Sequence, residues 1–381
     1  MMVTPPVALK AGEAAPLFVG ATLGGNAKFH FDTAAGCPTV LLFLGSGRSA
    51  QTAAALALLG RHRATFDDRQ ARFFGVTVDP DDAGSGRIAR QLPGIRWFLD
   101  YDGAISRAYG AAELTPSGTR LAPCWFLLDA MQRIVQRADL ADGPALFATL
   151  AQMIESTTEP TSAPVLIIPR LFEPDLCRTL IQQYEQHGGS RSGFMREENG
   201  QTVAKFDDAF KRRDDYHIRD EGFRAMLRER LVRRLLPQIE KAFQFRATRV
   251  ERWMVACYDS ASGGFFRPHR DNTTAGTAHR RFACTINLNA DEYEGGELRF
   301  PEFGPSTYRA PTGGAVIFSC SLLHEATPVT RGKRYAFLPF FYDDASARLR
   351  ERNQTRMAPE LAGYRMDGPS DDDRGTPKQL A

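Results

Sequence analysis

The segment GGFFRPHRDN, residues 263–272, decides how the second half of this chain is interpreted. It places His269 and Asp271 two residues apart, so their side chains point to the same face of an extended segment. His324 follows a separate predicted strand and can approach the same point from across a barrel. Two imidazoles and one carboxylate can occupy one face of an Fe(II) ion and leave three positions open. We therefore expect a metal site formed by His269, Asp271 and His324.

A second His-x-Asp pair occurs in the first half of the chain, at His30 and Asp32. It is followed by His62 and Arg72, so the spacing alone does not separate the two candidates. His62, however, projects from a predicted helix, residues 53–62, which a short loop connects to the preceding strand. Such a position is a poor source of a third ligand, and the context favours the second pair.

The sequence around the second pair is rich in predicted strands. Gly, Pro and Asp clusters separate apolar and alternating runs at short intervals, a pattern typical of an all-β sandwich or jelly roll. These runs are residues 249–258, 282–288, 297–300, 315–319 and 335–342. A jelly roll that carries the metal site is the predicted fold of this half.

Several motifs, in order along the chain, resemble the iron- and 2-oxoglutarate-dependent dioxygenases of the prolyl 4-hydroxylase type. MVACY (254–258) precedes GGFFRPHRDN, and EGGELRFP (294–301), PTGGAVIF (311–318) and HEATPVTRGKRY (324–335) follow it. The resemblance covers residues 164 to about 345. It implies a double-stranded β-helix (jelly roll) with flanking helices that hydroxylates a C–H bond. Fe(II) is the implied metal, 2-oxoglutarate and O2 are the implied cosubstrates, and ascorbate is an optional cofactor implied with them.

The same resemblance implies roles for individual residues. His269, Asp271 and His324 would bind Fe(II), and Arg334 would bind the distal carboxylate of 2-oxoglutarate. A planar guanidinium can make two parallel hydrogen bonds to a carboxylate, a geometry that a lysine lacks. Arg331 is the nearest alternative, but it lies in a predicted turn, whereas Arg334 begins a strand.

Two further positions concern the binding of the cosubstrate. Tyr258 matches a family tyrosine near 2-oxoglutarate, and it could equally be a wall residue at the end of its strand. Where some relatives carry a second tyrosine, this chain has Asn287, so the details of cosubstrate packing do not carry over from the family. By family analogy the leading substrate is a prolyl-type residue in a peptide or protein. A free amino acid or small metabolite is an alternative, as is a noncatalytic redox-sensing or interaction protein.

Predicted strands and helices alternate in the first half of the chain, which indicates a central sheet flanked by helices. The elements are residues 39–44, 53–62, 72–78, 85–91, 124–129 and 144–154. APLF (15–18), VLLF (40–43), FGVTVD (74–79), Tyr109-Gly110 and WFLLD (125–129) resemble the peroxiredoxin-like thioredoxin fold of the alkyl hydroperoxide reductase and bacterioferritin comigratory type. The expected fold class is therefore multidomain, α/β followed by mainly β.

The first half lacks the cysteine of a working peroxidase. Such an enzyme places a thiolate at the N-terminus of the helix after the first core strand. Here that segment reads GSGRSAQT, residues 45–52, and we interpret Cys37 and Cys124 elsewhere as buried apolar side chains. We expect no peroxidase activity; the fold could serve in docking, dimerisation or substrate presentation, and the turn at 45–49 could bind an anion.

Length and composition place these halves in one multidomain chain. At 381 residues it is long enough for two or three domains, and the polar segment ESTTEPTSAP, residues 155–164, predicts a linker. We expect a thioredoxin-fold domain at 1–155, a linker at 156–164, a dioxygenase domain at 165–345 and a partly disordered C-terminal extension at 346–381.

Charge and hydropathy bear on partners and location. The net charge is only +3, and an arginine-rich predicted helix at 220–243 also carries acidic residues. We interpret it as a solvated face, with an acidic partner or nucleic acid as the alternative. The first residues, MMVTPP, lack a secretory signal, no apolar run reaches membrane-spanning length, and the six cysteines contain no Cys-x-x-Cys pair. We expect a cytoplasmic protein that acts on a peptide, protein or small molecule, with no membrane partner and a homodimer through the N-terminal domain.

Overall fold

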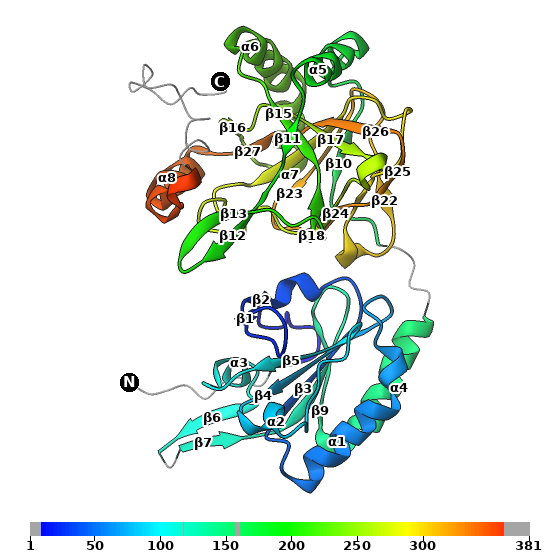
Figure 1. Ribbon diagram of the computed structural model, residues 1–381, viewed down its shortest axis with the longest axis vertical. Helices are drawn as coiled ribbons and strands as arrows, with labels where there is room; N and C mark the ends of the chain where they lie inside the picture. Colours follow the sequence, from blue (N-terminus) through cyan, green and yellow to red (C-terminus); the bar gives the residue numbers. More distant parts are fainter. Residues whose placement is uncertain (1–8, 117, 157–160, 362–381) are drawn as a thin grey trace. The chain divides into compact units, whose positions relative to one another are not determined.

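A computed structural model describes residues 9–116, 118–156 and 161–361 (Figure 1). The chain divides between Thr161 and Ser162 into two compact units, and the short segment Pro301–Pro305 is grouped with the first. These are called the first and second units below. The expected linker spans this division, but its residues 157–160 lie outside the described part, as does the expected tail beyond Leu361.

The first unit is built on a mixed sheet with the strand order β5-β4-β3-β8-β9 (Figure 1). Its parallel strands are β3 (Thr39–Gly45), β4 (Arg72–Thr77) and β5 (Ile95–Leu99), and its antiparallel strands are β8 (Cys124–Leu128) and β9 (Ile134–Asp139). Helices α1 (Ala50–Arg61) and α4 (Gly143–Glu155) share a core with one face, and α3 (Ala104–Ala108) contributes to the core on the other. This arrangement confirms the predicted thioredoxin-like α/β fold.

Local sequence explains most of these elements. Every residue of β3 is buried, as expected for a continuous apolar strand covered on both faces. The helix predicted at 85–91 is wrong: α2 spans Asp81–Gly84 instead. The Asp81 N–H donates to the Asp79 carboxylate at the start, and Gly86, at a φ of +72°, follows its end. Two short hairpins complete the unit: β1 (Val19–Gly20) with β2 (Phe29–His30), and β6 (Ala112–Thr115) with β7 (Gly118–Leu121).

The second unit contains two larger antiparallel sheets, which confirm the predicted jelly roll (Figure 1). The larger follows the order β10 (Leu166–Ile168), β23 (Ala315–Ser319), β19 (Phe282–Asn287), β26 (Lys333–Phe337), β17 (Met254–Asp259), β15 (Asp214–His217) and β11 (Ser190–Arg191), with β16 (Arg249–Glu251) and β27 (Phe340–Tyr342) joined to it. The other follows the order β14 (Lys211–Arg212), β18 (Phe265–His269), β24 (His324–Ala326), β21 (Leu298–Arg299) and β22 (Thr307–Tyr308). Short pairs are β12 (Phe194–Glu198) with β13 (Gln201–Lys205), and β20 (Glu294–Gly295) with β25 (Val329–Arg331).

Helices cover the larger sheet of this unit. Apolar residues of α5 (Pro174–His187), α6 (Glu221–Arg230) and α7 (Leu236–Phe243) form one buried core with it. The helix predicted at 220–243 is thus observed in two parts, joined by a π-helical turn at Leu231–Leu235 that precedes Pro237. Two of its arginines, Arg230 and Arg234, pair with Glu173. After the last strand, α8 spans Asp344–Asn353.

Two predicted strands are interrupted where the fold opens toward a cavity. The run at 249–258 divides into β16 and β17 because Arg252 between them has a φ of +70°. The run at 335–342 divides into β26 and β27 at Leu338 and Pro339, since proline has no N–H to donate to a neighbouring strand.

Among the helices of the described residues, none combines the length and the apolar composition needed to cross a bilayer. All six cysteines are buried and unpaired.

Candidate active site

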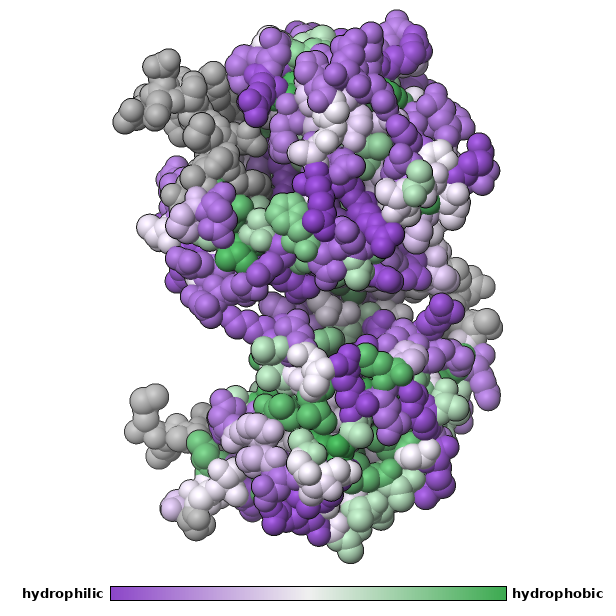
Figure 2. Space-filling view, viewed as in Figure 1, coloured by the Kyte–Doolittle hydropathy of each residue, from purple (hydrophilic) through white to green (hydrophobic). Residues whose placement is uncertain are grey.

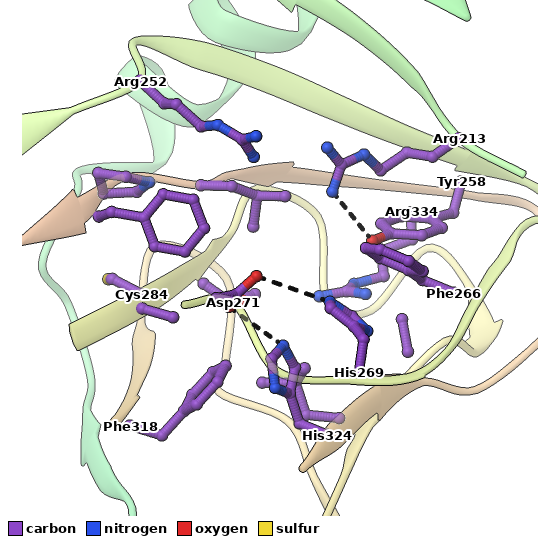
Figure 3. Close-up of a pocket in the computed structure, with 17 residues that line it drawn as sticks. Arg213, Arg252, Tyr258, Phe266, His269, Asp271, Cys284, Phe318, His324 and Arg334 are labelled. Atoms are coloured by element: carbon purple, nitrogen blue, oxygen red, sulfur yellow. Dashed lines mark hydrogen bonds and ion pairs between the residues drawn. The ribbon is translucent and has the colours of Figure 1, made fainter. Parts of the chain in front are cut away.

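Three side chains from two segments of the second unit converge on one point (Figure 3). His269 at the end of β18 lies directly opposite His324 at the start of β24, and Asp271 follows β18. The Asp271 carboxylate lies 3.7 Å from His269 Nε2 and 3.3 Å from His324 Nε2. In the part of the chain that the structure describes, this is the one group of three His, Cys, Asp or Glu side chains close enough to share a metal ion.

The remaining ring nitrogens of the two histidines are held by the backbone. His269 Nδ1 lies 2.8 Å from the Arg267 carbonyl oxygen, and His324 Nδ1 lies 3.0 Å from that of Leu322. Because a carbonyl only accepts, Nδ1 is the donor in both rings, and Nε2 is the nitrogen that faces Asp271. Such a contact is the usual support of a metal-binding histidine. The Phe266 ring, stacked 3.6 Å from that of His269, further fixes its orientation.

Burial sets the protonation of the site. It lowers the pKa of His269 well below its usual value, and the neighbouring His324 acts in the same direction. For Asp271, burial opposes ionisation, but the adjacent His324 and His269 outweigh it and lower the carboxyl pKa. A neutral imidazole and an ionised carboxylate are the forms that bind a divalent metal.

Arg334 is buried beside this group with much of its guanidinium unsatisfied. It is 2% exposed, and its Nε and Nη1 have no hydrogen-bond partner among the described residues. It lies opposite Tyr258 in the pairing of β26 with β17, 5.0 Å above the Tyr258 ring. A buried donor without an acceptor is costly, so this position favours an anionic ligand. Arg331 is instead exposed at the surface, where it pairs with Glu294.

A cavity connects these side chains (Figure 3). Its wall includes His269, Asp271, His324, Arg334 and Tyr258, the five residues singled out from the sequence. Other wall residues are Arg213, Arg252, Phe266, Ala283, Cys284, Thr285, Leu298, Phe318, Ala326, Leu338, Pro339 and Phe340.

Sequence reasoning missed the two additional arginines. Arg213 belongs to the run KRRDDY (211–216), which reads as an exposed charged strand but is buried where Arg213 donates to Asp215 at 2.8 Å. Arg213 also donates to the Tyr258 hydroxyl at 3.4 Å. Arg252 carries no sequence signal, because a positive φ at a non-glycine residue leaves no mark on hydrophobic periodicity.

The alternative His-x-Asp pair is not assembled into a site. His30 ends β2, Asp32 lies in a 3-10 turn, and His62 follows α1, where it stacks on Phe147 at 4.4 Å. Arg72 donates to the Ala35 carbonyl at 2.8 Å.

Other residues discussed from the sequence also have defined positions. The side-chain amide of Asn287 donates to the Ala310 carbonyl at 2.7 Å, away from the cavity wall. Burial raises the pKa of Cys37 to about 11 and also raises that of Cys124, so neither thiol is a ready nucleophile at neutral pH.

Residues 253–342 match the model of the 2OG-Fe(II) oxygenase superfamily. This segment is a 2OG-Fe(II) oxygenase domain. PKHD-type hydroxylases of Cupriavidus metallidurans and Pseudomonas fluorescens are similar to the oxygenase region. They are 35% identical over 114 residues (27% of this chain, 48% of the relative) and 34% identical over 118 residues (29% and 50%). The chain thus spans about half the length of the curated relatives that it matches.

Solved structures similar to each half were also found. A viral collagen prolyl hydroxylase from Paramecium Bursaria Chlorella virus-1 covers 48% of this chain and 97% of its own, with 15% identity and a TM-score of 0.36. AhpC of Mycobacterium tuberculosis covers 40% of this chain and 97% of its own, with 17% identity and a TM-score of 0.31.

Proposed function

We propose that this protein is an Fe(II)- and 2-oxoglutarate-dependent dioxygenase that hydroxylates a C–H bond, with a prolyl-type residue in a peptide or protein as the leading substrate. The observation that carries the proposal is the convergence of His269, Asp271 and His324 in one cavity with the buried Arg334. The sequence motifs indicate the same residues: three metal ligands, Arg334 for the cosubstrate and Tyr258 beside it.

The side chains of the candidate site fit Fe(II) and 2-oxoglutarate, the metal and cosubstrate for which the oxygenase family is named. His269 and His324 would bind Fe(II) through Nε2, and Asp271 would add the negative charge that a divalent cation requires. Arg334 would hold the distal carboxylate of 2-oxoglutarate on the N–H groups that lack a protein acceptor. When bound, Fe(II) and 2-oxoglutarate supply O2 activation coupled to decarboxylation of the cosubstrate to succinate and CO2.

The chain's own part is to orient and to shield. The Arg267 and Leu322 carbonyls retain the Nδ1 protons of the two histidines, so both rings are ready to bind metal without rotation. Phe266, Phe318 and Phe340 give the cavity apolar walls, which limit water around the reacting C–H bond.

The domain organisation belongs to the same proposal. We assign residues 1–155 to a thioredoxin-fold domain without peroxidase activity, 156–164 to a linker, 165–345 to the dioxygenase and 346–381 to a C-terminal extension. The division between Thr161 and Ser162 and the raised pKa of Cys37 support this assignment.

A homodimer through the first unit and a cytoplasmic location are also proposed. Figure 2 shows apolar side chains on the surface of that unit, and Leu17, Val19 and Leu114 are at least half exposed. Unpaired cysteines suit a reducing compartment. Light scattering on the wild type and a Leu114→Glu variant measures the oligomeric state, and a monomeric wild type would overturn the dimer.

The dioxygenase proposal is tested by adding Fe(II) and 2-oxoglutarate to the protein without O2. We expect a visible charge-transfer band that disappears in His269→Ala and persists in His217→Ala, an exposed histidine on β15. Admission of O2 should then give succinate. A wild-type protein with neither the band nor succinate would favour the noncatalytic alternative.

A further inference from the structure

The charged groups around the cavity are predominantly basic. Three arginines, Arg213, Arg252 and Arg334, line it together with one carboxylate, that of Asp271. The two histidines add no negative charge. A cavity of this composition attracts anions.

The proposed function assigns roles to two of these four groups. Asp271 is assigned to the metal and Arg334 to the distal carboxylate of 2-oxoglutarate. Arg213 is matched by the buried Asp215, to which it donates at 2.8 Å. Arg252 lines the same cavity, and the proposed function assigns it no role.

An unusual backbone conformation places Arg252 at the cavity. It lies between β16 and β17 at a φ of +70°, a conformation that non-glycine residues seldom adopt and that clusters at ligand sites. Figure 3 shows its guanidinium directed into the cavity above Asp271. The group lies 5.0 Å from the centre of the Phe340 ring, another wall residue, which supports it from one side.

We infer that the substrate carries a carboxylate that Arg252 binds, an inference that rests on the proposed dioxygenase function. A guanidinium grips a carboxylate by two parallel hydrogen bonds, more strongly than it grips a neutral oxygen. The Phe318, Leu338 and Phe340 side chains in the same wall suit the apolar carbons next to that group. The carboxylate has two sources: the α-carboxylate of an amino acid, or an acidic side chain beside the target residue in a peptide.

Matched pairs of probes test this inference and separate the two sources. The first pair is L-proline and L-prolinamide, and the second is acetyl-Ala-Pro-Glu-Ala-amide and its Gln counterpart. Binding is measured anaerobically by calorimetry on full-length protein loaded with Fe(II) and 2-oxoglutarate. In at least one pair, we expect the carboxylate to bind about tenfold or more tighter than the amide, as for a hydrogen bond to a charged group.

Three variants assign the preference to Arg252. Arg252→Gln should abolish the discrimination, and Arg331→Gln, a surface control paired with Glu294, should retain it. Arg252→Glu should reverse it, binding acetyl-Ala-Pro-Lys-Ala-amide more tightly than the Glu peptide, a result that a misfolded variant cannot give. Equal binding of both members of each pair by the wild type, or no binding at all, would overturn the inference, as would unchanged discrimination in Arg252→Gln.

Failure of this inference is distinguishable from failure of the proposed function. The charge-transfer band and the slow formation of succinate without substrate depend on the metal and cosubstrate alone. A wild type that gives both signals but ignores the probe carboxylate refutes only the role of Arg252. Loss of both signals in the wild type refutes the dioxygenase itself.

Discussion

The two units each contain a His-x-Asp pair followed by a later histidine and an arginine, yet only the second unit assembles them. There, His269 and His324 face each other on neighbouring strands, which brings together residues far apart in the sequence. In the first unit, His62 follows a helix and stacks on Phe147 instead. Strand pairing, and not motif spacing, therefore creates the three-point site.

The largest expected effect comes from the two aspartates. Asp271→Ala removes the negative charge from the convergent group and should lower Fe(II) affinity and succinate formation by more than the roughly 10–100-fold that loss of an outer partner costs. Asp32→Ala, the matched change in the first unit, should leave both unaltered. Metal content after anaerobic dialysis and succinate release are the measurements, and equal losses in both variants would contradict the contrast.

The reactivity of Cys37 tests whether the first unit lacks catalytic chemistry. Burial raises the pKa of Cys37 to about 11, so only about one thiol in ten thousand is ionised at pH 7. Alkylation of this residue by iodoacetamide should be slower than that of an exposed thiol by on the order of 100-fold, since its usual pKa is about 8.5. Peptide mass mapping over time measures the rate of alkylation. Rapid alkylation of Cys37, together with consumption of added peroxide, would show that the first unit is a catalyst.

The arginines that follow each pair should also differ. Arg334→Met removes the proposed carboxylate anchor and should raise KM for 2-oxoglutarate by about 10–100-fold. It should also raise the Tm of the ligand-free protein, because it removes a buried charge whose donors lack acceptors. Arg72→Met deletes donors to backbone carbonyls and should lower Tm without affecting KM. If Arg72→Met raised KM for 2-oxoglutarate and Arg334→Met did not, the cosubstrate would bind elsewhere.

The smallest effect is on stability against pH. His269 has a pKa lowered by burial, so below about 6.5 the unfolded chain takes up a proton that the folded chain resists. The free energy of unfolding of the metal-free protein should therefore fall as pH drops from about 6.5, by at most about 1.4 kcal/mol per pH unit for this group. The lowered pKa of Asp271 acts at lower pH, where stability is lost below about 3.9.

Urea titrations between pH 4 and 8 measure this slope. His269→Gln should flatten it, whereas His217→Gln, at an exposed position, should not. The buried His279, whose pKa burial also lowers, retains its own contribution in both variants. An unchanged profile in His269→Gln would mean that its ring is not buried in the neutral form.

The sequence predicted the jelly roll and the composition of the candidate site because both leave local patterns. Alternating apolar runs marked β17, β19 and β23, and the motif around His269 placed two ligands on one face. The turn predicted at Arg331 was wrong, because Arg331 ends β25 and Arg334 is the second residue of β26. The two arginines differ instead in burial: Arg334 is 2% exposed, whereas Arg331 is exposed and pairs with Glu294.

The features that could not be predicted from the sequence depend on single backbone angles or on the burial of a charge together with its partner. The interruption at Arg252 follows from a single backbone angle, and the burial of Arg213 is possible only because Asp215 is buried with it. In the first unit, β5 and β9 were overlooked, and a helix was placed at 85–91 where turns occur. None of these features has a periodic signature.

The interruptions of the strands at Arg252 and at Leu338–Pro339 separate the residues that line the cavity from the strands that position the two histidines. The two histidines of the candidate site belong to a hydrogen-bonded pair of strands, whereas Arg252, Leu338 and Pro339 lie between the strands that line the same cavity. Replacing a side chain in such a break leaves that pairing intact. Substitutions at these breaks can therefore change which substrate binds, while the pairing of the strands that carry the two histidines stays the same.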